Sequence, residues 1–217
     1  MGERIEGGSA REEGHGEQGA REGGGLVDGG GGGESEQNGI EKKGKGGVTL
    51  RGAGQAVVRD SKVHHGRDSG VHCMLGGGGT LEENDIFENE HAGIAVETGG
   101  CPVIRRNRIH HGKQAGCFFF EQGMGSLCEN EVWENQEAGV QIIEGADPLV
   151  QGNRLLRQAH DKMGFPPLWI HSGGRGTLQD NEISGSYWHG AVIGGMAQPL
   201  LQNNRIHGNS KSGVFMQ

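Results

Sequence analysis

Short apolar runs recur along this chain at a nearly constant step of 23 residues. Asn-x-aliphatic triplets mark the step after a degenerate copy at Ser61, and their Asn residues are Asn84, Asn107, Asn130, Asn153, Asn181 and Asn204. A Gly before an aliphatic-x-aliphatic run keeps the same phase, and Pro167 replaces it once. One five-residue insertion, between Asn153 and Pro167, interrupts the step. A fixed period of this size is typical of a solenoid, in which each repeat buries its apolar face against the next.

The apolar positions within one repeat predict three short strands. Leu81 and Ile86 mark the first two strands of one coil, and Ile94 and Val96 alternate in the third. Helical repeats are excluded because Gly or Pro occurs every few residues, and a leucine-rich repeat is excluded because Gly or Pro stands where it needs Leu. The pattern therefore predicts an all-β fold: a right-handed parallel β-helix solenoid with about seven 23-residue coils over residues 46–217.

Charged residues follow the same step. The residue after each Asn, together with Lys62, alternates in sign from coil to coil: Lys62, Asp85, Arg108, Glu131, Arg154, Glu182, Arg205. A second ladder runs through His65, Glu88, His111, Glu134 and Arg157. We interpret both as devices that fix the register of stacked coils. For the Asn column we expect left-handed turn residues whose side-chain amides hydrogen-bond along the axis.

Composition limits the remaining possibilities. Residues 1–45 hold sixteen Gly residues, ten acidic and six basic residues, and they are predicted to form a disordered Gly/Glu-rich tail. The net charge of −8 indicates no nucleic-acid footprint. No apolar stretch marks a secretory signal or a membrane span, so we expect a cytoplasmic or nuclear protein. Cys73 and Cys117 fall on inward positions and are predicted core residues.

The outward positions of the third strand suggest a binding surface. An inert solenoid would carry polar residues there, yet an apolar stripe is predicted across several coils: Phe118, Phe120, Ile143, Trp169, His171 and Val192. Such patches mark interaction surfaces, although packing against the tail or a second copy is an alternative. Phe165, in the insertion, is one coil from Trp188 and forms a second predicted aromatic feature. A column of His64, Phe87, His110 and Trp133 is interpreted as packing.

The segment ENDIFENEHAGIAVETGGCPVIRRNRIHHGKQAG, at residues 83–116, resembles the β-helix repeats of F-box-only β-helix proteins, the substrate receptors of cullin-based ubiquitin ligases. The resemblance covers about residues 46–217. Because the Gly-rich tail is not expected to form the helical F-box, the resemblance implies the protein-recognition part of such a receptor, acting in protein ubiquitination.

The rival class consists of proteins that bind or modify polysaccharides, as many right-handed β-helices are lyases, hydrolases or epimerases. Those reactions need convergent carboxylates, often with a metal ion. The sequence shows no such cluster, so we predict no catalytic residue, metal ligand or cofactor. The favoured hypothesis is a non-catalytic module that binds a protein partner. The final strand, from Gly213 to Met216, opens a coil whose apolar side chains are uncovered, and we therefore expect end-to-end self-association.

Overall fold

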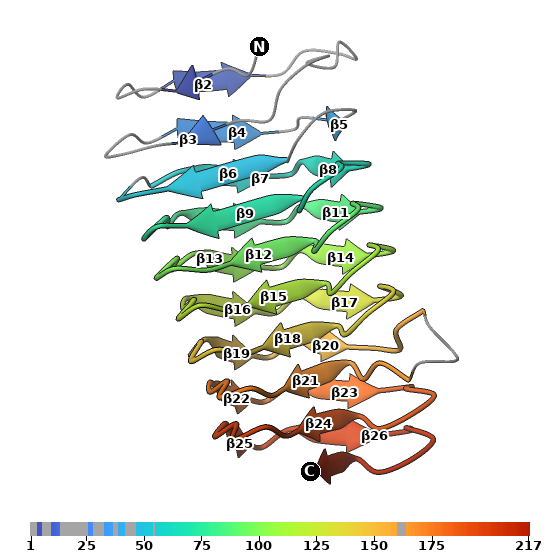
Figure 1. Ribbon diagram of the computed structural model, residues 1–217. Helices are drawn as coiled ribbons and strands as arrows, with labels where there is room; N and C mark the ends of the chain where they lie inside the picture. Colours follow the sequence, from blue (N-terminus) through green and yellow to red (C-terminus); the bar gives the residue numbers. More distant parts are fainter. Residues whose placement is uncertain are drawn as a thin grey trace.

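The computed structural model describes residues 47–53, 55–159 and 164–217, as well as five short strands between residues 4 and 41. In this part of the chain all regular elements are strands, and they form flat coils stacked into a prism (Figure 1). The predicted all-β parallel solenoid is confirmed.

Three parallel sheets form the walls of the prism, and each coil from β6 to β26 contributes one strand to each sheet. The ten-stranded sheet contains, in order, β1 (Arg4–Ile5), β3 (Leu26–Val27), β6 (Val48–Arg51), β9 (Val71–Met74), β12 (Ile94–Val96), β15 (Cys117–Phe119), β18 (Val140–Ile142), β21 (Leu168–Ile170), β24 (Ala191–Ile193) and β27 (Val214–Met216). The nine-stranded sheet contains β2 (Ala10–Glu13), β4 (Gly33–Glu36), β7 (Val57–Arg59), β10 (Thr80–Glu82), β13 (Val103–Arg105), β16 (Ser126–Cys128), β19 (Leu149–Gln151), β22 (Thr177–Gln179) and β25 (Leu200–Gln202). The eight-stranded sheet contains β5 (Gly39–Glu41), β8 (Lys62–His64), β11 (Asp85–Phe87), β14 (Arg108–His110), β17 (Glu131–Trp133), β20 (Arg154–Leu155), β23 (Glu182–Ser184) and β26 (Arg205–His207).

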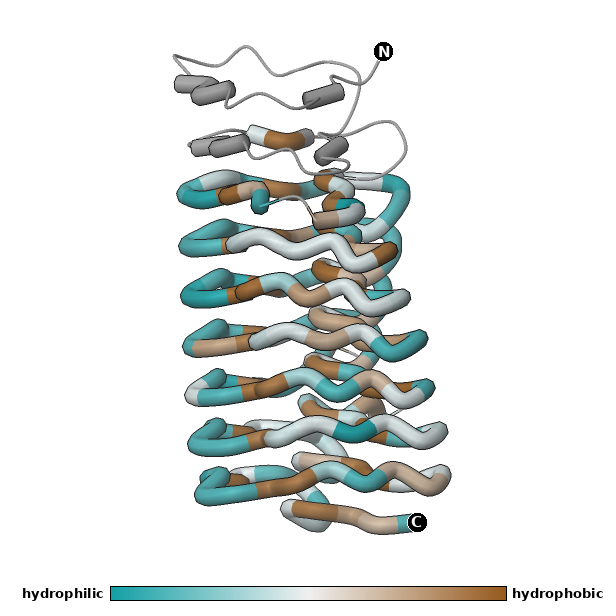
Figure 2. The backbone as a smooth tube through the Cα atoms, turned by 90° about the vertical axis from the view of Figure 1, so that its left-hand side faces the viewer, coloured by the Kyte–Doolittle hydropathy of each residue, from teal (hydrophilic) through white to brown (hydrophobic). Residues whose placement is uncertain are grey.

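The core lies inside the prism and is built from the inward side chains of all three sheets. Leu81, Ile86 and Ile94 are fully buried, as are the equivalent residues of the neighbouring coils. Figure 2 shows the resulting alternation of apolar and polar segments along the tube. Cys73 and Cys117 belong to this core as predicted, and burial raises the pKa of both thiols, that of Cys73 to about 12. A buried thiol of this kind is protonated and unreactive at neutral pH.

The recurring Gly before the third strand is explained by close approach of successive coils. A Cβ on Gly116 would lie 2.7 Å from the carbonyl oxygen of Gly139 and 2.5 Å from the Val132 side chain. The Gly93 position is equally close to the carbonyl oxygen of Gly116. The Gly marker is therefore a packing requirement of the stack rather than a chemical motif.

We expect Gly116→Ala to lower the free energy of unfolding by about 3 kcal/mol, because the new methyl overlaps backbone atoms that cannot move away. Gly145→Ala is the matched control: its φ is +73° but its nearest neighbouring atom is 3.8 Å away, so only backbone strain of about 1 kcal/mol is expected. Urea denaturation of both variants measures the difference, and equal losses would contradict the close-approach explanation.

The Asn column forms one straight line of buried amides, as predicted. The Nδ2 of Asn84 donates to the Oδ1 of Asn107 at 2.9 Å, and the same bond continues from Asn107 to Asn130 at 3.0 Å. One part of the prediction was wrong, since the Asn residues are not in the left-handed conformation. The residue before each of them has the positive φ, for example +56° at Glu83 and +54° at Arg106. This leaves the Asn side chain free to point inward and to bond the next coil.

The charge ladder pairs in the predicted register. Asp85 lies between Lys62 and Arg108, and Glu131 lies between Arg108 and Arg154. The carboxylate of Glu131 is 2.5 Å from Arg154, while that of Asp85 is 3.8 Å from Arg108. In the second ladder, His65 pairs with Glu88 at 2.7 Å. Glu134 pairs with both His111 and Arg157, and the hydrogen bond from Arg157 holds the pKa of Glu134 below its usual range.

Arg108→Glu is expected to cost about 1 kcal/mol of stability, because it places a third carboxylate between Asp85 and Glu131. Reversing Asp85 and Glu131 as well restores attraction inside the triplet, but it creates repulsion with Lys62 and Arg154 at the two ends, so the triple variant should regain little. Thermal melts at low and high salt provide the measurement, and the loss should shrink at high salt. An Arg108→Glu variant that melts like the wild type at low salt would show that the ladder has no energetic role.

Most of residues 1–45 lies outside the described residues, as do residues 160–163 of the insertion, so the predicted disorder of the tail is not tested. The five described strands, β1 to β5, extend the parallel stacking upstream, for example with Ala10 opposite Gly33 and Gly39 opposite Lys62. These strands were not predicted, because their pairing uses backbone groups and the apolar marker of the repeats is almost absent from residues 1–45. None of the described segments is a helix that is long and apolar enough to cross a membrane.

Candidate functional site

The outer face of the ten-stranded sheet carries two rows of side chains that point away from the core. The first row follows the middle of the strands: Thr49, His72, Ala95, Phe118, Gln141, Trp169, Val192 and Phe215. The second row lies two residues further along each strand: Arg51, Met74, Glu97, Phe120, Ile143 and His171. Because stacked strands lie about 4.8 Å apart, the rows place neighbouring side chains in direct contact.

A flat aromatic surface occupies the middle of this face. Phe118 and Phe120 stack with ring centroids 4.6 Å apart and planes inclined by 19°. Both rings are only partly buried, as is Ile143 on the next coil. The structure thus brings together three of the residues that the sequence predicted for a binding stripe.

A polar pair adjoins the aromatic surface. The side-chain amide of Gln141 lies 3.0 Å from the Nε2 of His171, and the Nδ1 of His171 lies 2.9 Å from the Ser172 hydroxyl. Burial lowers the pKa of His171, against an opposing effect of Glu144. At neutral pH this imidazole is uncharged, and the pair offers neutral hydrogen-bonding groups to a ligand.

The C-terminal part of the predicted stripe is less accessible than expected. Trp169 packs against His171 at 4.2 Å and against Phe165 at 5.8 Å, and its indole Nε1 is buried without a hydrogen-bond partner among the described residues. Val192 points outward but is only 1% exposed, so its prediction as a binding residue is corrected. Its register neighbours are Trp169 and Phe215, whose larger side chains flank it. We therefore leave Val192 out of the surface.

The N-terminal part of the same face holds an acid–base pair that the sequence analysis missed. The Nε2 of His72 lies 2.8 Å from the carboxylate of Glu97, whose side chain is only 13% exposed. Arg51 lies on the coil that precedes His72, and its Nε is buried without a partner in the described part of the chain. The 23-residue step could have revealed this pair, because His72 is two repeats before Phe118 and Glu97 is one repeat before Phe120.

A second candidate surface lies on the eight-stranded sheet. The predicted column is present as a continuous stack, with centroid separations of 4.7 Å for His64 and Phe87, 5.4 Å for Phe87 and His110, and 4.2 Å for His110 and Trp133. Burial lowers the pKa of His110, although a hydrogen bond to Asp85 opposes the shift. The four rings stack on one another from coil to coil, which supports the packing interpretation.

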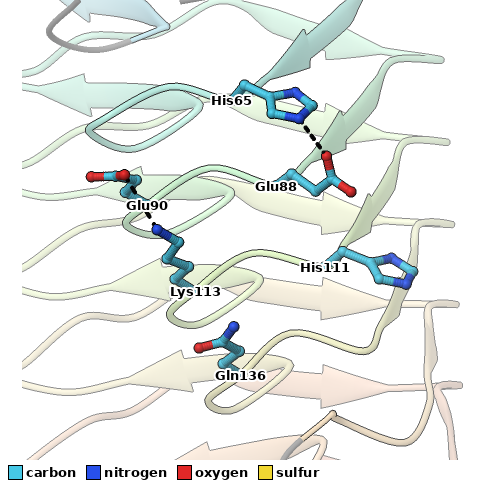
Figure 3. A pocket seen from close by; sticks show the side chains of 6 residues that line it. All are labelled: His65, Glu88, Glu90, His111, Lys113 and Gln136. Atoms are coloured by element: carbon cyan, nitrogen blue, oxygen red, sulfur yellow. Dashed lines mark hydrogen bonds and ion pairs between the residues drawn. The ribbon is translucent and has the colours of Figure 1, made fainter. Parts of the chain in front are cut away.

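Beside this column is an open hollow of about 360 Å³, shown in Figure 3 and lined by His65, Glu88, Glu90, His111, Lys113 and Gln136. The charged groups on its walls are already paired, His65 with Glu88 at 2.7 Å and Lys113 with Glu90 at 3.2 Å. His65, Glu88 and His111 belong to the second register ladder, and Lys113 and Glu90 form one more pair between neighbouring coils. Within the described residues, no group of three or more His, Cys, Asp or Glu side chains could hold a metal ion.

Comparison with known proteins supports the fold. The family model described as a right handed beta helix region matches residues 18–155 and 129–217. Among solved structures, the A-module of mannuronan C-5 epimerase AlgE4 from Azotobacter vinelandii is similar, with a TM-score of 0.65, 15% identity and coverage of 89% of this chain and 62% of that one. The A-module of epimerase AlgE6 from the same organism has a TM-score of 0.57 and 12% identity, with coverage of 89% and 58%.

This chain therefore spans less than two thirds of the length of these two structures. At such low identity the likeness shows the fold alone. No curated protein matches the sequence. None of these comparisons shows the resemblance to F-box substrate receptors.

Proposed function

The chain belongs to the right handed beta helix family, and from that premise we propose that it binds a polysaccharide along the outer face of its ten-stranded sheet. The observation that carries the proposal is the partly exposed, stacked pair of Phe118 and Phe120. The face of an aromatic ring is electron-rich, and the C–H groups on one side of a sugar ring are attracted to it. A stacked pair offers a surface suited to such a ring.

The polar groups beside the rings suit the same ligand. Gln141 and His171 supply an amide and a neutral imidazole next to the aromatic pair, and sugar hydroxyls both donate and accept hydrogen bonds. Specific small-ligand sites combine apolar surface with a few placed polar groups in this way. The rows continue from coil to coil, so an extended chain laid along the axis would contact outward side chains of several coils.

The two structural neighbours lend support, because each is by name an enzyme that acts on a polysaccharide, mannuronan. They favour the polysaccharide hypothesis over the F-box hypothesis. The proposal concerns binding and includes no reaction. The hydrogen-bonded pair of Glu97 and His72 lies on the same face, with Glu97 one coil and His72 two coils from the aromatic pair.

Recognition of a protein by the same face is the second candidate function. Partly exposed aromatic rings, which anchor many protein interfaces, favour it. In that case the aromatic pair contacts a protein partner rather than a sugar, and end-to-end self-association stays a separate prediction. The two candidates differ in one property: only the first requires the purified protein to bind polysaccharide.

Affinity electrophoresis tests the proposal. The wild-type protein is run through native gels that contain a panel of dissolved polysaccharides, and its mobility is compared with that in a gel without polymer. We expect retardation by at least one polymer, which a Phe118→Ser/Phe120→Ser variant loses. Mobility that no polymer changes would reject polysaccharide binding and leave protein recognition as the better explanation of the face.

A further inference from the structure

The charges that border the aromatic pair are of one sign. Five consecutive coils supply the third strand and its flanking turns in the stretches 91–99, 114–122, 137–145, 165–173 and 188–196. These stretches contain no Lys or Arg, and they contain four carboxylates: Glu97, Glu121, Glu137 and Glu144. Over these five coils the outer face thus carries acidic side chains and no Lys or Arg, and Arg51 lies on the same face three coils before Phe118.

The carboxylates lie close to the aromatic rings. Glu121 directly follows Phe120, and Glu144 directly follows Ile143; both are exposed and have positive φ values of 44° and 53°. The Thr98 hydroxyl donates to Glu121 at 3.1 Å. Glu137 precedes β18 on the opposite edge of the sheet. The aromatic surface is therefore bordered by Glu121 and Glu144 where the strands end, and by Glu137, whose pKa burial raises, before the start of β18.

The basic groups nearest to this surface are already engaged or neutral. Lys113 pairs with Glu90 at 3.2 Å on the turn that precedes β15. His171 is uncharged at neutral pH, because burial lowers its pKa. His72 is held by Glu97 at 2.8 Å. Among the described residues, a ligand carboxylate placed over the rings would find acidic neighbours and no unpaired partner of opposite charge.

Resting on the proposed glycan-binding function, we infer that this face takes an uncharged polysaccharide and rejects polyuronates. Mannuronan, on which the structural neighbours act by name, carries one carboxylate on every sugar. Laid along the outer face, it would bring those charges well within the Debye length of about 10 Å at 0.1 M salt from the four glutamates. Each unpaired contact of this kind opposes binding. On the same fold, this chain would thus take an uncharged polysaccharide, whereas its structural neighbours act by name on a charged one.

The test compares neutral and acidic polymers in the same gels. Wild-type protein is run at low ionic strength with a β-glucan, a xylan and a galactomannan, and in parallel with alginate and polygalacturonate. We expect retardation by at least one neutral polymer and an affinity for both polyuronates at least tenfold weaker. Retardation by the neutral polymer should change less than twofold when salt is raised. Glu121→Gln/Glu144→Gln should increase retardation by the polyuronates, because it removes two of the repulsive charges.

The outcomes of the two proposals are distinguishable. Polyuronate retardation that equals or exceeds that by the neutral polymers, and that the Phe118→Ser/Phe120→Ser variant loses, would overturn the inference but uphold glycan binding at this face. A charge variant that binds polyuronates no better than the wild type would also count against the inference. Mobility that no polymer changes would reject the proposed function and the inference together.

Discussion

Replacing Asn130 with Ala is expected to lower the free energy of unfolding by about 4 kcal/mol, because it leaves several buried polar groups without partners. The Oδ1 of Asn130 accepts from the backbone N–H and the side-chain amide of Asn107, at 2.9 and 3.0 Å. Its own amide donates to the carbonyl oxygens of Ile104 and Cys128 and to Asn153, each at 3.0 Å. The side chain is 1% exposed, so water cannot replace these bonds.

Asn204→Ala is the matched control for that result. Asn204 ends the column, is only partly buried, and bonds Asn181 and the carbonyl oxygen of Leu178. Its loss should cost less than half as much, since solvent reaches the groups it leaves. Chemical denaturation gives both values. A small effect at Asn130, or equal effects at the two positions, would mean that the amide column does not hold the coils together.

The fold could be predicted because each coil repeats the same arrangement of three short strands with inward apolar residues. A 23-residue step with apolar residues in a fixed phase leaves a stack of three-stranded coils as the arrangement that buries every run. The left-handed residue was misplaced by one position because Glu83 and Arg106 do not have the side chains that usually signal this conformation. Their turns are imposed by the inward Asn that follows, which is a tertiary requirement.

A second amide column was missed for a related reason. The Oδ1 of Asn135 accepts from the backbone of Gly112 at 3.0 Å, and the backbone of Asn135 donates to Gln158 at 3.0 Å. The same position is occupied by Gly112 on one coil and by Gln158 on another, so no single residue type repeats. Backbone groups supply the missing partners, and a sequence pattern does not record them.

The candidate site was only partly predictable. Alternation placed Phe118, Phe120 and Ile143 on the outer face, where they lie in the structure. Accessibility was not predictable at Val192, since it depends on the size of neighbours that are 23 residues away or more. The pairing of His72 with Glu97 likewise joins residues 25 positions apart on adjacent coils.

Phe118→Ser/Phe120→Ser is expected to weaken polysaccharide binding at least tenfold, a loss of about 1.4 kcal/mol or more, because it removes the whole stacking surface. The fold should persist, since both side chains point away from the core. Val103→Ser is the matched control, an exposed apolar residue on the nine-stranded sheet of a neighbouring coil. The measurement is the dissociation constant of each variant, obtained by titration with a polymer that retards the wild-type protein. Equal weakening by the Val103 variant would point to a general loss of folded protein.

The most direct test of the central claim is the Ile δ1 methyl spectrum of the isotopically labelled protein during titration with a polymer that retards it. Ile143 lies beside Phe120 in the second row of the outer face, whereas Ile206 packs against the core from the eight-stranded sheet. The account predicts that the Ile143 methyl signal shifts with saturation while that of Ile206 does not. A saturable titration that moves Ile206 and leaves Ile143 unchanged would place the bound polymer elsewhere and contradict the assignment of this face.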